Sequence, residues 1–181
     1  MSLELLGGKV MAPYFGNSIY VWGSIITVFM LSLSIGYLLG GRLSVRTPSY
    51  VRFGSIFVIA GGLLFPLILF ADAIMDLVFG WIEDPRYGSL VAATGLFMIP
   101  TIILGMISPY SVRLLVDSVA HSGQTAGRLY FVSTLGSAIG TLATSFYFVL
   151  HFEINSILSA LTSLLLLLGA SAITASRLRH A

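Results

Sequence analysis

The chain has 181 residues, of which 57% are hydrophobic, only 9% are charged and none is cysteine. A soluble domain carries about 25% charged residues, so this composition excludes a water-soluble globular protein and indicates an integral membrane protein. A net charge of +2 is too small for a nucleic-acid-binding surface. The lack of cysteine excludes disulfides, thiol catalysis and cysteine-ligated metals.

The N-terminal segment, MSLELLGGKVMAPYFG, is apolar but interrupted. It lacks the basic leader and small-residue cleavage site of a signal peptide. Glu4 and Lys9 interrupt it, and the roughly 12 residues before Pro13 are too few to cross a bilayer, which takes about 20. We expect either a half-helix packed among the other helices or a true start upstream of Met1.

Apolar runs between breaking residues predict five membrane spans. The expected spans cover residues 18–41, 53–79, 88–115, 127–150 and 154–176. All must be helices, because an open sheet edge would leave backbone groups unpaired in lipid. The sequence therefore predicts an all-α, polytopic transmembrane helical bundle, forming a single membrane domain over residues 1–181, with the half-helix as an addition to it.

Arginine placement predicts the orientation of these spans. Seven of the nine Lys and Arg residues lie in alternate loops and the C-terminal tail, and two lie on the opposite side. Cytoplasmic loops carry the excess of positive charge, so we expect an inner-membrane protein with a cytoplasmic C-terminus. The loop arginines, which either set topology or contact a partner, are Arg42, Arg46, Arg52, Arg113 and Arg128.

Two spans carry small residues at four-residue intervals. These are Ser32, Gly36 and Gly40 in the first span, and Gly136, Gly140 and Thr144 in the fourth. Residues four apart share a helix face, and small residues allow neighbouring backbones to approach closely in lipid. Both stripes are therefore predicted to be helix-packing seams, and Gly136→Leu or Gly140→Leu is expected to loosen the bundle.

Three acidic residues lie in or near apolar segments. Glu4 is in the N-terminal segment, and Asp72 and Asp76 lie on one face toward the outer end of the second span. An ionisable group inside a membrane suggests function, so these residues form a candidate intramembrane polar site. The alternative is a wetted helix end, which we favour for the Asp72 and Asp76 pair.

The sequence offers no visible catalytic, cofactor-binding or metal-binding set. His121, His151 and His180 are too scattered for a metal site, and all three lie at span ends. Prolines that can bend helices lie at Pro66, Pro100 and Pro109.

Three sequence blocks resemble a known family. ELLGGKVMAPYFGNSIYVWGSIITVFMLSLSIGYLLGGRLSVR, SPYSVRLL and GRLYFVSTLGSAIGT are similar to the membrane half of the spermidine-synthase-like membrane proteins, also described as fused major-facilitator/spermidine-synthase proteins. The resemblance covers about residues 3–150. It implies a helical inner-membrane domain, often followed by a Rossmann-like aminopropyltransferase-like or methyltransferase-like domain.

Two features depart from that family. No G-x-G-x-x-G unit is present, so we expect the soluble enzyme to be encoded separately. The loop GYLLGGRLSVR is similar to a major-facilitator loop whose Asp–Arg pair acts in the conformational switch. Val45 stands where the acidic member is expected, which argues against alternating-access transport of that kind.

Three functions follow as expectations. The first is a non-catalytic membrane subunit that anchors or regulates a soluble spermidine-synthase-like partner. The second is a small transporter or exporter of polyamines or related cations that acts as a homodimer. The third is an accessory subunit of a larger membrane complex. The lipid bilayer is the expected partner in every case, and nucleic acid in none.

Overall fold

The structure, a computed structural model, describes residues 1–45, 48–116 and 121–180, and within these ranges the chain is helical with no strand. The helices are α1 (Ser2–Phe15), α2 (Ile19–Val45), α3 (Tyr50–Trp81), α4 (Pro85–Gly105), α5 (Ile107–Leu115), α6 (Ser122–Ala143), the π-helical turn η2 (Thr144–Phe148), α7 (Val149–His151) and α8 (Ile154–His180).

The prediction of an all-α bundle with five spans is confirmed. Five segments are long and apolar enough to cross a membrane: Ile19–Val45, Tyr50–Trp81, Pro85–Leu115, Ser122–His151 and Ile154–Leu178. Each matches one expected span to within several residues. The chain is therefore a multi-pass membrane protein by length and composition.

The N-terminal segment of this sequence forms a short helix that packs among the other helices, which is one of the two alternatives stated above. α1 is 14 residues long, about 21 Å at 1.5 Å per residue, and packs against α2, α3, α4, α6 and α8. Leu6 and Met11 are fully buried. Gly16, with a φ of 73°, supplies the left-handed conformation that turns the chain into α2.

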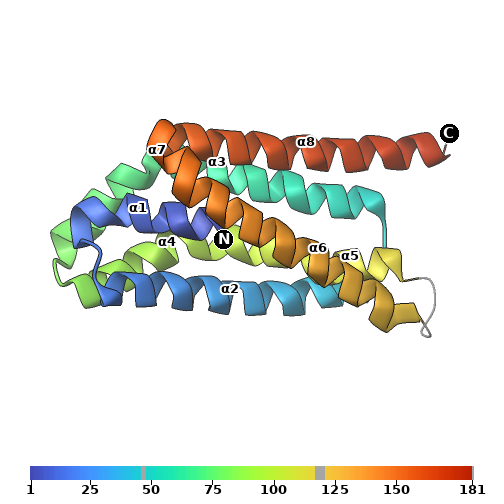
Figure 1. Cartoon of the computed structure of the whole chain (residues 1–181), viewed down its shortest axis with the longest axis horizontal. Coiled ribbons are helices and arrows are strands. Elements are labelled where there is room, and N and C mark those ends of the chain that lie inside the picture. The colour runs from blue at the N-terminus through green and yellow to red at the C-terminus, as the bar shows by residue number, and fades with distance from the viewer. Residues whose placement is uncertain (46–47, 117–120, 181) are drawn as a thin grey trace.

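Four long helices form a row in the order α2, α4, α3, α8, with α2–α4 and α3–α8 the most extensive pairings. α1 lies over this row, and α6 crosses it obliquely (Figure 1). We call one end of the bundle the arginine-bearing end, since it holds Arg42, Arg52, Arg113, Arg128 and Arg177. The opposite, acidic end holds Asp72, Asp76, Glu83, Asp84 and Glu153.

The first small-residue stripe lies on the α2–α4 seam. Ser32 is fully buried, and a Cβ on Gly36 would meet the Ile102 carbonyl oxygen and lie 2.9 Å from Gly105 Cα. A Cβ on Gly40 would lie 2.6 Å from Met106 Cα. Both glycines therefore allow backbone-to-backbone contact, which is how helices associate in lipid.

A second seam, between α3 and α8, was missed by the sequence analysis. A Cβ on Gly54 would lie 2.6 Å from the Gly169 carbonyl oxygen, and a Cβ on Gly169 would lie 2.7 Å from the Gly54 carbonyl oxygen. Gly61, seven residues along α3, faces Thr162 and Leu166 of α8. Residues seven apart share a helix face, so the spacing of Gly54 and Gly61 in the sequence indicates the α3 side of this seam.

The third span is interrupted at one residue close to Pro109, one of the prolines expected from the sequence to bend a helix. α4 ends at Gly105 and α5 begins at Ile107. Pro109 lies four residues after Gly105, so it lacks the N–H that would bond the Gly105 carbonyl, and its ring would clash with that carbonyl. α5 then continues to Leu115 at the arginine-bearing end.

The fourth span is barely covered by the rest of the chain. Only 6% of its most apolar window is buried, against 22% to 39% for the other four spans. Of the second small-residue stripe, Thr144 is buried and Gly140 contacts Ser2 of α1. A Cβ on Gly136 would meet nothing within 4 Å. The expectation that Gly136→Leu loosens the bundle therefore has no contact to support it within the described chain.

The α2–α4 seam makes a stability prediction. Gly36→Ala is expected to lower the free energy of unfolding by about 1–3 kcal/mol, because two backbones must separate to admit the methyl group. The matched control is Gly23→Ala on the same helix, where a Cβ meets nothing and helix propensity favours alanine by up to ~1 kcal/mol. Melting in detergent measures both variants, and equal midpoints would contradict the seam.

Candidate functional site

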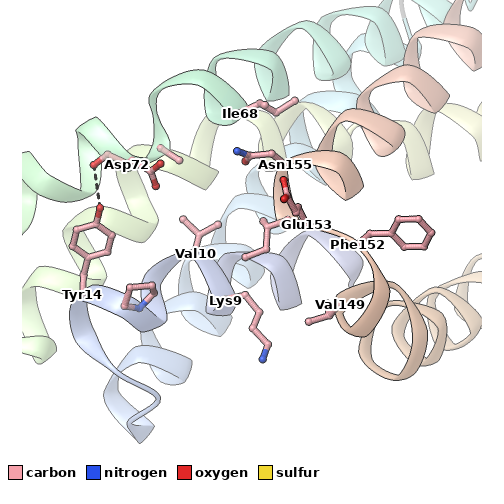
Figure 2. A pocket seen from close by; sticks show the side chains of 12 residues that line it. Lys9, Val10, Tyr14, Ile68, Asp72, Val149, Phe152, Glu153 and Asn155 are labelled. Carbon is pink, nitrogen blue, oxygen red and sulfur yellow. Dashed lines mark hydrogen bonds between the residues drawn. The ribbon is translucent and has the colours of Figure 1, made fainter.

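A polar cleft opens at the acidic end, between α1, α3 and the start of α8. Its volume is about 520 Å³. Figure 2 shows Asp72 from α3 and Glu153 and Asn155 from the α8 end directed toward the cleft, whereas the Lys9 ammonium points away from them. Apolar side chains of α1, α3, α7 and the start of α8, with Phe152 between the last two, complete its wall: Val10, Pro13, Ile68, Ala71, Val149, Phe152 and Ile154.

Tyr14 ties α1 to α3 beside this cleft. Its hydroxyl donates a hydrogen bond to the Asp72 carbonyl oxygen at 3.5 Å, and its ring meets Phe79 edge-on at 6.1 Å. Partial burial raises the pKa of the Tyr14 phenol, and the Asp76 and Asp72 carboxylates raise it further, because each effect favours the neutral phenol. Tyr14 therefore stays a neutral hydrogen-bond donor next to two carboxylates.

The three acidic residues singled out in the sequence do not form one cluster. Asp72 lines the cleft, whereas Asp76 is exposed one turn further along α3, and Glu4 is half-buried on α1 outside the cleft lining. The other charged residues that line the cleft with Asp72 are Glu153 and Lys9. Sequence spacing could not bring these two to Asp72, because they come from segments far apart along the chain.

The arginine-bearing end is held by a buried tyrosine that the sequence analysis overlooked. Tyr110 of α5 is fully buried. Its hydroxyl accepts a hydrogen bond from the Ser49 backbone N–H at 3.1 Å and lies 3.4 Å from the Ser49 carbonyl oxygen. Its ring stacks on Phe53 with centroids 6.0 Å apart. Ser49 is also the N-cap of α3, so Tyr110 fixes the start of α3 to α5.

Four helices present exposed guanidinium groups at this end. They are Arg42 of α2, Arg113 of α5, Arg128 of α6 and Arg177 of α8. None of these four makes an ion pair or hydrogen bond with a residue that the structure describes. Arg52 is exposed at the start of α3. Arg46 lies outside the described residues.

At the acidic end, by contrast, Arg86 has partners. Its guanidinium lies 4.9 Å from the centroid of the Tyr20 ring, and its backbone N–H donates to the Asp84 side chain, the N-cap of α4. This cation is therefore held by its own chain, unlike the four guanidinium groups at the other end.

Within the described ranges, no group of three or more His, Asp or Glu side chains is arranged to hold a metal ion. His151 lies against Tyr147, with ring centroids 4.5 Å apart and Nδ1 2.8 Å from the Tyr147 carbonyl oxygen. This contact lies within one helical turn and places no other titratable group beside the imidazole.

Comparison of the chain with protein-family models, with curated proteins and with solved structures finds no match. The class that fold and composition define is a polytopic α-helical membrane protein. Any narrower assignment therefore depends on the residues at the two ends of the bundle.

Tyr110→Phe tests the anchor of the arginine-bearing end. Removal of the hydroxyl leaves the Ser49 N–H without that acceptor, which is expected to cost about 1–3 kcal/mol. Melting in detergent measures the loss. Tyr87→Phe is the control, since Tyr87 is 67% exposed, and an equal change in both variants would remove the role assigned to Tyr110.

Proposed function

We propose that this protein is a non-catalytic membrane subunit that holds a soluble, spermidine-synthase-like partner at its arginine-bearing end. The observation that carries the proposal is the set of exposed guanidinium groups on α2, α5, α6 and α8 with no carboxylate partner among the described residues. The class of partner comes from the family resemblance of the sequence.

The chemistry of arginine supports a docking role. A guanidinium offers five donors in a fixed fork and binds a carboxylate through two parallel hydrogen bonds. Four such groups on separate helices suit an acidic surface of a soluble protein, and their charge would steer that protein to the membrane. The α2–α4 and α3–α8 seams and the Tyr110 anchor position the helices that hold Arg42, Arg113 and Arg177 relative to one another.

The cleft at the acidic end favours transport of an organic cation as the second candidate function. Asp72 and Glu153 are directed toward it, and the Lys9 ammonium points away (Figure 2). Such a cleft would attract a polyamine through its carboxylates. The cleft lies at one end of the bundle, so this candidate also needs a pathway through the helices.

The docking proposal is tested by capture from native membranes and cell extract. The Arg42→Gln, Arg113→Gln double variant is expected to retain a spermidine-synthase-like protein roughly fivefold less than the unsubstituted chain, the effect of two surface charge pairs worth up to ~1 kcal/mol together. Arg86→Gln at the acidic end is the control. Equal retention by all three proteins, or capture of no such enzyme, would contradict the proposal.

The orientation of the chain in the membrane is tested by cysteine labelling. The chain contains no cysteine, so a single introduced cysteine is the only thiol that can react. A membrane-impermeant thiol reagent is expected to label Tyr87→Cys in intact cells and Arg113→Cys only after permeabilisation. Labelling of Arg113→Cys from outside would place the arginine-bearing end away from any cytoplasmic enzyme.

The transport candidate is tested with the purified chain in proteoliposomes. Uptake of spermidine is expected to fall severalfold in Asp72→Asn and Glu153→Gln, since each removes a carboxylate from the cleft. Glu83→Gln, an exposed carboxylate of the α3–α4 connection, is the control. Absence of uptake by the unsubstituted chain would exclude this function.

A further inference from the structure

An open groove separates α6 from α2, α4 and α5 toward the arginine-bearing end. Its volume is about 940 Å³. The oblique path of α6 across the helix row can be followed in Figure 1. On the α6 side the lining runs from Thr125 and Arg128 to Ser137, with Leu129, Val132 and Ser133 between them. The facing wall includes Leu33 and Tyr37 of α2, Leu104 and Gly105 of α4, and Ile107, Ser108, Ser111 and Leu115 of α5.

α1 closes only the end of this groove toward the acidic side. The Ser2 hydroxyl donates a hydrogen bond to the Gly140 carbonyl oxygen at 3.3 Å and accepts one from the Thr144 hydroxyl at 3.0 Å. Met1 lines the groove, and one turn before Gly140, a Cβ on Gly136 meets nothing within 4 Å. The open part of the groove is thus continuous with the packed α1–α6 interface.

The groove combines a cation near the beginning of α6 with apolar walls. Arg128 is exposed, lines the groove near the beginning of α6, and has no ion-pair or hydrogen-bond partner among the described residues. Thr125 lies one turn earlier on the same face. Leu33, Leu104, Leu129 and Val132 provide apolar walls, and Ser133, Thr134 and Ser137 also line the groove along α6. From Arg128 to Ser137 the helix rises about 13 Å, close to the ~15 Å of hydrocarbon in one leaflet.

We propose that the groove binds an anionic phospholipid, with its phosphate at Arg128 and one acyl chain along the groove toward Ser137. The cation at the mouth, the apolar walls and the one-leaflet length match that ligand in charge, polarity and reach. A basic pocket between membrane helices on the cytoplasmic side is a known type of anionic-lipid site. The Thr125 hydroxyl donates a second hydrogen bond to the phosphate, and the acyl chain occupies the open space beside Val132 and Ser133.

The site shares Arg128 with the protein-docking surface proposed above, but its ligand lies in the membrane. The docking variants leave Arg128 intact, so the two proposals are tested by different substitutions. Arg113 of α5 is exposed at the same end but does not line the groove, so it provides a matched charge control on the neighbouring helix.

Native mass spectrometry tests this proposal. The full chain is reconstituted in nanodiscs that contain phosphatidylglycerol and phosphatidylcholine, and the lipids that stay bound after its release are identified by mass. The unsubstituted chain is expected to retain phosphatidylglycerol preferentially. Arg128→Gln is expected to reduce that retention about fivefold, the worth of one juxtamembrane cation, and Arg113→Gln to leave it unchanged. Equal retention of the two lipids, or an equal loss in both arginine variants, would overturn the proposal.

Ser133→Leu tests the acyl-chain part of the groove. Ser133 is exposed and lines the groove, so a leucine there is expected to leave the melting midpoint unchanged while bound lipid of both kinds falls severalfold. If the variant instead lowers the melting midpoint, or changes the mass of the protein assembly while lipid retention stays the same, a helix occupies the groove and the lipid assignment is wrong.

Discussion

Close approach of helix backbones is the constraint on which the rest of this structure depends. Lipid is as apolar as leucine, so membrane helices gain little from burying apolar side chains and associate through tight packing. Gly36 and Gly40 on one seam, and Gly54 and Gly169 on the other, bring backbone atoms together where a methyl group would not fit. These contacts fix the row α2–α4–α3–α8, which positions the exposed groups of those four helices at either end.

The rigid row separates the charges of the chain into two different environments. At the acidic end, the Asp72 and Glu153 side chains are directed toward one cleft (Figure 2), and the Arg86 guanidinium lies over the Tyr20 ring. At the other end, Arg42, Arg113, Arg128 and Arg177 have no partner among the described residues. Because the unpartnered guanidinium groups lie at the arginine-bearing end, both proposed partners, the soluble protein and the lipid, are assigned to that end.

The two small-residue stripes show what the spacing of residues in the sequence can predict about helix packing. Both follow the same four-residue pattern, yet Gly36 is packed against α4 while Gly136 faces open space. The pattern identifies a helix face that admits close approach, but it does not say whether the chain supplies the neighbour. Likewise the Asp72 and Asp76 pair was visible in the sequence, whereas the cleft joins Asp72 to Lys9 and Glu153 from distant segments.

The sequence by itself determined the medium, the helical class and the number of spans. Each of these follows from local composition, because a bilayer requires about 20 apolar residues for a crossing and full backbone hydrogen bonding within it. Only the tertiary structure decided which helices touch, that Tyr110 fixes the start of α3, and that α6 stands apart from its neighbours over an open groove. These features depend on contacts between residues far apart in the chain, which local patterns do not encode.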